Sequence, residues 1–267
     1  MSKKLLGVLL GAGALVTAFP FIWMVSTSFK PLGESRTYPP TVVPSRFSLE
    51  SYIRLFRDLD FGTYLLNTVA VVVINVIGLL LMTMAGYGFA KFRFRWRGIM
   101  FGLVLATMMI PAQVTMIPTY LILNSVGLTN TLPGIALPAL VSAFQIFLFR
   151  QFMTTIPDDL LDSARIDGAG EMRVFTSIVL PISRPILAVQ AVLTFIAGWN
   201  SFLWPLIIAN DQEKYTLAVG LALLNRQLSV NPPLQMAGAS LMVVPIIIVF
   251  VIFQRHIVRG FTMSGMK

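Results

Sequence analysis

The stretch Leu65–Phe89, LLNTVAVVVINVIGLLLMTMAGYGF, decides the fold of this chain of 267 residues. Its 25 residues contain no Asp, Glu, Lys or Arg, and about 20 mostly apolar residues suffice for a helix to cross the hydrocarbon core of a bilayer. Runs of the same kind recur along the chain, so the sequence predicts an all-α integral membrane protein with six transmembrane helices. The predicted spans are Leu5–Phe29, Leu65–Phe89, Ile99–Leu123, Leu132–Phe149, Pro185–Ile208 and Met236–Phe253.

The composition supports a membrane protein and excludes several kinds of site. Hydrophobic residues make up 56% of the chain and charged residues 12%, with a mean hydropathy of +0.81. A soluble domain carries about 25% charged residues. The chain has no cysteine and a single histidine, His256, which excludes disulfides, thiolate metal sites and a histidine-rich metal centre. No metal is therefore expected.

Basic residues predict how the chain is oriented in the membrane. Six spans place both termini on one side, and the segments on that side hold 13 of the 20 basic residues. Because basic residues collect on the cytoplasmic side, both termini are expected in the cytoplasm. The simplest role of this positive charge is to orient the chain against anionic lipid of the bilayer, and binding of nucleic acid need not be invoked. The first span is expected to be retained, since its apolar run is longer than that of a signal peptide and no clear cleavage site follows.

The charges also bear on the source of energy. All 31 charged residues lie outside the predicted spans, whereas ion-coupled carriers usually place ionisable residues inside the bilayer. The chain also lacks the G-x-x-x-x-G-K-[ST] loop that holds ATP phosphates. Uphill transport would therefore need energy from a partner. Prolines and polar residues interrupt the spans, which leaves two interpretations open: hydrogen bonding between helices or a polar path.

The segment 150–184, between the fourth and fifth predicted spans, is the most informative loop. Pro157-Asp158-Asp159 predicts a helix start, with acids near the positive end of the helix dipole, and Gly168 predicts its stop. A second short helix is expected from about Glu171 to Val179, ending before Pro181. Residues that could form a small apolar face are Leu160, Leu161, Ala164 and Ile166. Two interpretations compete: an interfacial helix pair on lipid headgroups, or an element that docks into a groove on a soluble partner.

The residues 162–169, DSARIDGA, followed by Phe175, Ile178, Leu180 and Pro181, resemble the EAA loop of binding-protein-dependent ABC importer permeases. In that family the short helix of this loop couples to the ATP-binding subunit. Asp162 replaces the usual Glu and Ser163 replaces an Ala, so charge sign and small size are kept. The coupling residues that this resemblance implies are Asp162, Ser163, Ala164, Asp167, Gly168 and Ala169.

The resemblance extends over the whole chain. The segments 28–31, 47–52 and 195–206 are similar to the carbohydrate branch of the family, and the tail 260–267 looks like that of the smaller maltose-type permease subunit. The resemblance implies a type I ABC importer permease fold, with residues 1–267 as one transmembrane domain in a bacterial or archaeal plasma membrane. It also implies a heterodimer with a second homologous permease, two copies of an ABC ATPase, and an extracytoplasmic sugar-binding protein. The chain itself would hold no cofactor, because the ATPase binds ATP and Mg.

Sugar contacts are predicted from chemistry, since neutral sugars need amides, hydroxyls and an aromatic face. Trp199 and Asn200 in the fifth predicted span fit this need, and Asn67 and Gln113 are further candidates. Trp199 fits interfacial anchoring or helix packing equally well, and the partner permease is another possible location for the solute contacts. A polyol phosphate such as glycerol 3-phosphate is an alternative substrate. A passive channel and a non-transport scaffold are alternatives of other classes.

Overall fold

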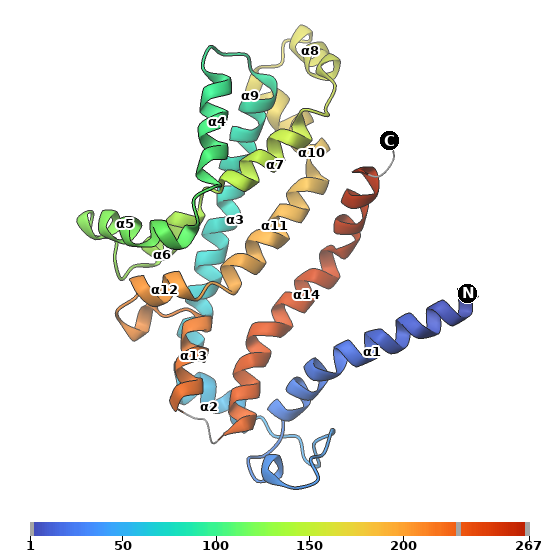
Figure 1. The fold of residues 1–267 in the computed structure, drawn as a ribbon, viewed down its shortest axis with the longest axis vertical. Coiled ribbons are helices and arrows are strands. Elements are labelled where there is room, and N and C mark those ends of the chain that lie inside the picture. Colours follow the sequence, from blue (N-terminus) through green and yellow to red (C-terminus); the bar gives the residue numbers. More distant parts are fainter. Residues whose placement is uncertain (1–2, 228–230, 265–267) are drawn as a thin grey trace. The chain divides into compact units, whose positions relative to one another are not determined.

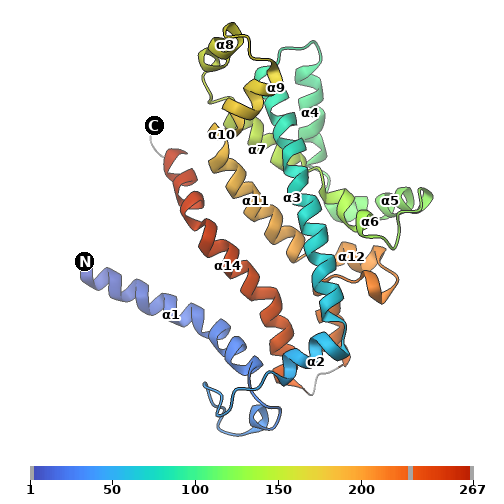
Figure 2. The same ribbon diagram turned by 180° about the vertical axis from the view of Figure 1, so that it is seen from behind.

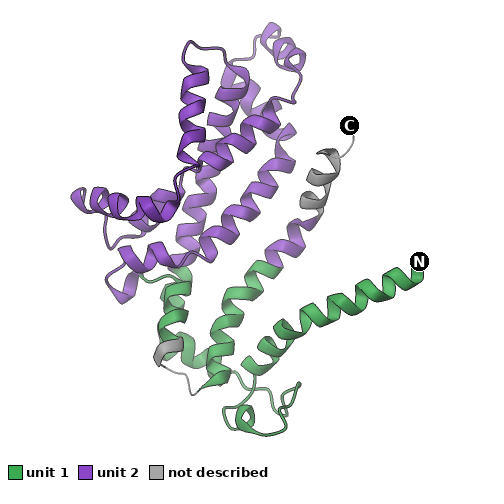
Figure 3. Cartoon of the chain, in the orientation of Figure 1, with its two compact units in different colours: residues 1–66, 215–247 green, residues 67–214, 248–267 purple. Residues whose placement is uncertain are grey.

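A computed structural model describes residues 3–227 and 231–264, with side chains for residues 4–224 and 231–254. Every regular element in these ranges is helical (Figures 1 and 2). The side chains of the tail 260–267 lie outside the described residues. The chain divides into two compact units, residues 1–66 with 215–247 and residues 67–214 with 248–267 (Figure 3).

The first unit contains the long helix α1, parts of two other long helices, and shorter helices. Its elements are α1 (Lys3–Ser28), η1 (Glu34–Arg36), α2 (Glu50–Asp58), the first residues of α3 (Phe61–Lys91), α13 (Leu217–Gln227) and the first part of α14 (Pro232–Ser264). Small residues permit close packing here. A Cβ atom on Gly220 would lie 2.3 Å from the Tyr64 ring, and one on Gly238 would lie 2.7 Å from Leu221.

The second unit carries most of α3 and the broken helices. Its elements are α4 (Arg97–Thr107), α5 (Ala112–Ser125), α6 (Leu132–Ala136), η2 (Leu137–Ala139), α7 (Ala143–Met153), α8 (Asp158–Ile166), α9 (Glu171–Val174), the π-helical turn η3 (Phe175–Val179), α10 (Leu180–Ile182), α11 (Arg184–Trp199), α12 (Leu203–Ile208) and η4 (Gln212–Lys214). Residues 248–264 of α14 also belong to it. The core between α3 and α7 consists of Leu79, Met82, Ile146 and Phe149.

Three described helices are long and apolar enough to cross a membrane unbroken: Lys4–Ser28, Phe61–Lys91 and Pro232–Gln254. Three further pairs of helices reach the required length only together. They bend by 102° between α4 and α5, by 45° between the α6–η2 segment and α7, and by 77° between the α9–α10 segment and α11. The six-span prediction holds if each bent pair is one span.

Two predicted boundaries are wrong, and the second has a local physical reason. The fifth span was predicted to run from Pro185 to Ile208, but its helix ends at Trp199, and a separate helix, α12, begins at Leu203. The second short helix of the segment 150–184 was predicted to end before Pro181, but the chain stays helical from Glu171 to Ile182. The π-helical turn at Phe175–Val179 changes the hydrogen-bond register ahead of Pro181, which has no N–H to donate.

Glycines on α3 allow α7 and its preceding segment to approach closely. A Cβ atom on Gly86 would lie 2.5 Å from the Phe149 Cβ and 3.0 Å from the Arg150 backbone nitrogen. A Cβ atom on Gly78 would lie 2.5 Å from the Leu140 carbonyl oxygen. In lipid, where apolar side chains gain little by leaving the solvent, close packing at small residues is a main source of helix association.

Gly86→Ala is expected to destabilise the second unit, since the added methyl meets a Cβ and a backbone atom that have little room to move. Overpacking of this kind costs about 1–3 kcal/mol, so the detergent-solubilised protein should melt several degrees lower. Gly88→Ala is the matched control, because nothing lies within 4 Å of its Cβ position on the same helix. Equal melting temperatures for both variants would contradict the close α3–α7 contact.

Candidate functional site

The first candidate site is the loop of residues 154–170 that carries α8. The helix spans Asp158–Ile166, with Pro157 as its N-cap residue and Asp158 and Asp159 in its first turn. Gly168 has φ +81°, and its N–H donates to Arg165 O while the Ala169 N–H donates to Ala164 O, both at 3.0 Å. This is the Schellman arrangement that ends a helix at a left-handed residue. The predicted helix start and the glycine stop are confirmed.

One face of α8 is seated on an apolar cluster. Leu161 is 1% exposed and lies in a cluster with Tyr87, Val174 and Phe175, while Ala164 and Ala169 pack at its edge. The other two residues of the predicted apolar face, Leu160 and Ile166, do not join this cluster and are 48% and 86% exposed. Their places on the helix turn them away from the cluster.

The six residues implied by the family resemblance divide into two groups. Asp162, Ser163, Asp167 and Gly168 are exposed. The two alanines are half-buried against the cluster, where a larger side chain would separate α8 from its seat. The role of these six residues in ATPase coupling stays a prediction.

Charged side chains hold this loop against its neighbours. Lys91 Nζ donates to Asp158 Oδ1 at 2.6 Å, and this hydrogen bond, with the lysine charge, holds the pKa of the Asp158 carboxyl below its usual value. Arg165 donates to Glu171 at 2.7 Å and to Asp162 at 2.8 Å. Hydrogen bonds to Glu171 first, and then to Asp162, raise the pKa of the Arg165 guanidinium, which therefore stays charged.

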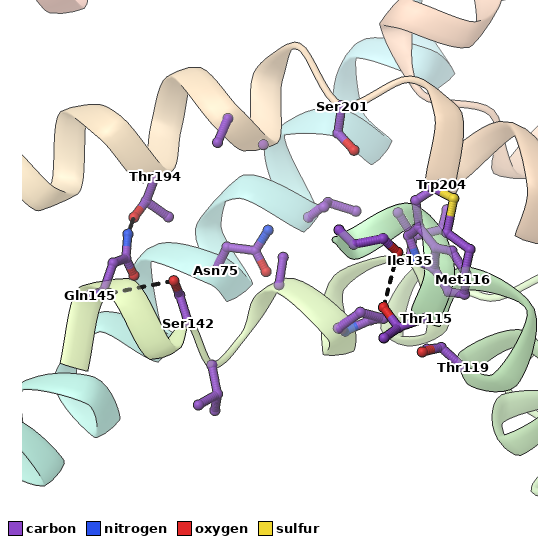
Figure 4. Close-up of a pocket in the computed structure, with 17 residues that line it drawn as sticks. Asn75, Thr115, Met116, Thr119, Ile135, Ser142, Gln145, Thr194, Ser201 and Trp204 are labelled. Carbon is purple, nitrogen blue, oxygen red and sulfur yellow. Dashed lines mark hydrogen bonds between the residues drawn. The ribbon is translucent and has the colours of Figure 1, made fainter. Parts of the chain in front are cut away.

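The second candidate site is a pocket of about 570 Å³ inside the second unit (Figure 4). This volume is in the range of small-molecule sites. The pocket lies where α5, α7, α11 and α12 begin or end beside α3. The residues that line it are Val71, Asn75, Ala112, Thr115, Met116, Thr119, Ile135, Pro138, Ala139, Val141, Ser142, Gln145, Thr194, Ala197, Gly198, Ser201 and Trp204.

The pocket combines amides and hydroxyls with an indole and carries no charged residue in its lining. Gln145 Nε2 donates to Thr194 Oγ1 at 2.7 Å, which leaves the Gln145 amide oxygen as an acceptor. Asn75 is 2% exposed, and its Oδ1 accepts no hydrogen bond among the described residues. A buried acceptor without a partner is costly.

None of the four residues predicted for the solute pathway lines this pocket. Trp199 is 4% exposed and stacks on Phe195 with ring centroids 5.2 Å apart, and Asn67 Nδ2 donates to Glu213 O at 2.7 Å. Asn200, beyond the end of α11, and Gln113 on α5 are exposed. Their role in the pathway stays a prediction.

The amides Asn75 and Gln145 are among the polar residues that interrupt the predicted spans and left a polar path open, and both line the pocket. Neither was among the four residues predicted for the solute pathway. Ser201 and Trp204 reach the pocket because the fifth predicted span breaks after Trp199, and sequence spacing gave no indication of that break.

Comparisons with known proteins agree with this architecture. Residues 82–263 match the family described as "Binding-protein-dependent transport system inner membrane component". The chain is 36% identical over 258 residues to the arabinooligosaccharides transport system permease protein AraQ of Halalkalibacterium halodurans, covering 95% of this chain and 92% of that protein. It is 34% identical over 268 residues to the sn-glycerol-3-phosphate transport system permease protein UgpE of Yersinia pestis bv. Antiqua, covering 95% and 93%.

A solved structure extends the likeness to the fold. One chain of a bacterial ABC transporter involved in the import of the acidic polysaccharide alginate superposes with a TM-score of 0.82 at 26% sequence identity. The match covers 96% of this chain and 98% of that chain.

Gly168→Ala is expected to loosen the end of α8. A non-glycine residue in the left-handed region costs about 1–2 kcal/mol, which corresponds to a roughly 5- to 30-fold rise in amide hydrogen exchange over residues 158–169. Gly170→Ala is the control, because Gly170 has φ −67° and, like Gly168, has no atom within 4 Å of its Cβ position. If the two variants exchanged alike, backbone strain at Gly168 would not be what ends the helix.

Proposed function

We propose, from the premise that this chain belongs to the family of binding-protein-dependent transport system inner membrane components, that it is one permease subunit of an ATP-driven importer of an uncharged carbohydrate. Family membership confirms the resemblance and the importer permease fold expected from the sequence. The chain is thus a multi-pass membrane protein of a transport system. The family is one of non-catalytic permeases.

The uncharged lining of the pocket, in which amides and hydroxyls lie among mostly apolar residues, is the observation that carries the choice of substrate. Its amides and hydroxyls suit sugar hydroxyls, and Trp204 supplies an aromatic surface. Such groups orient a neutral ligand without the cost of burying a charge. The relative from Halalkalibacterium halodurans, named for arabinooligosaccharides, supports a carbohydrate.

A polyol phosphate is the alternative that the Yersinia relative raises. Recognition of phosphate relies on Arg or Lys side chains, or on helix N-termini. The pocket lining contains no Arg or Lys, and the N-termini of α5 and α7 beside it each carry only about half a unit of positive charge. An alginate uronate would lack a full counter-charge there for the same reason. A neutral oligosaccharide therefore fits this subunit better than either anion.

The proposed assembly contains a second homologous permease, two ATPase copies that hold ATP and Mg, and an extracytoplasmic sugar-binding protein. The exposed face of α8, with Asp162, Ser163 and Asp167, would meet the ATPase. With both termini in the cytoplasm, as the distribution of basic residues favours, the segment 31–49 lies outside the cell. Closure of the ATPase dimer would move α8 and shift the permease from its inward-open to its outward-open state. Such a shift requires only that ATP and the binding protein bind the two states of the complex with different affinity.

The outer segment has features that suit a protein partner. Glu34 accepts hydrogen bonds from the backbone N–H and hydroxyl of Ser45 and from the Thr41 hydroxyl, and these bonds, led by the backbone one, hold the pKa of its carboxyl below the usual value. The segment is thereby held in one conformation while Tyr38 and Phe47 stay 95% and 73% exposed. Pre-ordered aromatic residues are effective anchors for protein contacts.

A pull-down of the tagged chain from native membranes in mild detergent tests the assembly. We expect an ABC ATPase and a second six-helix permease to co-purify, and the binding protein encoded beside them can then be screened for sugars. Recovery of the chain alone, with uptake insensitive to ATP, would favour a passive channel.

Gln145→Ala is expected to weaken uptake of the neutral sugar by the reconstituted transporter. Loss of one hydrogen bond of about 0.5–1.5 kcal/mol corresponds to a roughly 2- to 13-fold higher half-saturating concentration. Gln151→Ala on the same helix is the control, since Gln151 is exposed and lies outside the pocket. Preferential uptake of glycerol phosphate or a uronate over every neutral oligosaccharide would contradict the proposed substrate.

A further inference from the structure

A continuous chain of polar contacts links α8 to the end of α3. The Tyr87 hydroxyl, on a side chain that is 5% exposed, donates to Glu171 Oε2 at 3.1 Å. Arg165 Nε donates to Glu171 Oε1 at 2.7 Å, and Arg165 Nη2 donates to Oε2 at 3.2 Å. Arg165 Nη1 completes the chain by donating to Asp162 Oδ1 at 2.8 Å. Helices α3, α8 and α9 thus meet at the Glu171 carboxylate, which accepts from both Tyr87 and Arg165.

A second attachment lies at the other end of α8. Lys91, the last residue of α3, donates to the Asp158 carboxylate at 2.6 Å and to the Ile156 carbonyl. The Lys91 side chain is 6% exposed. Between the two attachments, Leu161 is buried beside Tyr87 in the apolar cluster. The first residue and the last turn of α8 are therefore both tied to the terminal turns of α3.

We infer that Arg165 is a positioning residue that makes α8, the start of α9 and the end of α3 move as one body. This inference rests on the proposed function, because it takes α8 as the element that the ATPase moves. It assigns to Arg165 an internal role and not a contact with the ATPase.

The geometry of the guanidinium supports an internal role. Each of its three nitrogens already donates to a carboxylate of the same loop. Arginine forms such paired contacts because its donors lie in a rigid planar fork, which lysine lacks. Ile166, the next residue, is 86% exposed, so the outward face of α8 is available to a partner without disturbing the link.

The link connects α8 to two helices that line the pocket, α3 and α11. Helix α3 carries Asn75 as well as Tyr87, and the helical run that starts at Glu171 continues through the bend into α11, which carries Thr194. Motion of α8 as a rigid body would thereby reach two pocket-lining helices. Coupling requires that the ATPase and the solute bias the same two-state element. If α8 were loosely attached, it could still bind the ATPase but would transmit little of the ATPase motion to the pocket.

The test measures solute taken up per ATP hydrolysed by the reconstituted complex, together with the amount of ATPase bound. We expect Arg165→Ala to lower this ratio by about threefold or more, while assembly stays normal. Arg165→Lys should recover part of the loss, since it keeps the charge but not the fork. Arg173→Ala is the matched control, because Arg173 is exposed in the same loop and makes no ion pair within the described ranges.

A distance measurement separates this inference from the proposed function. The chain has no cysteine, so spin labels at Asp159→Cys on α8 and Gly88→Cys on α3 are unique within it, and partner subunits are used without cysteines. We expect one narrow distance distribution, unchanged by ATP, in the otherwise unaltered chain and a broader one with Arg165→Ala. Tyr87→Phe, which removes only the hydroxyl, should also broaden the distance distribution, but to a smaller extent. This variant provides the test if Arg165→Ala does not fold.

Three results would overturn the inference: an unaltered uptake ratio with Arg165→Ala, an unaltered distance distribution with Arg165→Ala or Tyr87→Phe, or an equal loss of coupling with Arg173→Ala. Absence of sugar uptake by the unmodified complex would instead contradict the proposed function. The label distances would still test the link in that case.

Discussion

The requirement that every backbone N–H and C=O be hydrogen-bonded inside hydrocarbon governs this structure. Water is absent there, so a spanning segment must be helical, and a break is tolerated only where protein or a cavity satisfies the freed groups. The breaks at Pro111, at Val141–Ser142 and at Asn200–Phe202 all lie at or next to the pocket. The polar space of the second unit is thus a consequence of where its helices are interrupted.

Close helix contact is the second requirement, and it determines how rigid the second unit is. Gly78 and Gly86 let α3 touch the segment around α7 at backbone distance, and the buried residues Met82 and Phe149 fill the space between those contacts. A well-packed helix pair of this kind moves as a unit because interiors at this density do not deform continuously. Motion in a permease is therefore expected at the bends, where packing is interrupted, and not within the α3–α7 pair.

Local features of the chain could be predicted from the sequence with good accuracy. The start of α8 follows from Pro157 and the two acids after it, and its stop follows from Gly168, because helix capping depends on residues within one turn. The long apolar helix α3 followed from length and composition. Features that depend on contacts between distant segments could not be predicted: the break after Trp199, and the hydrogen bonds that Glu171 accepts from Arg165 and Tyr87.

The sequence by itself determined the class of the protein, the positions of the apolar runs, the exclusion of charge from them and the family. Each of these depends on composition or on short motifs, which carry their physical meaning in any fold. The tertiary structure alone decided which polar residues share a pocket and which charged residues pair with one another. Asn75, Gln145, Thr194 and Trp204 are far apart in the chain and meet only because four helices bend or break beside α3. Asp162 was predicted as a residue that couples to the ATPase, and only the folded loop shows that it also accepts a hydrogen bond from Arg165. Hydrogen bonds between side chains depend on geometry that spacing along the chain does not supply.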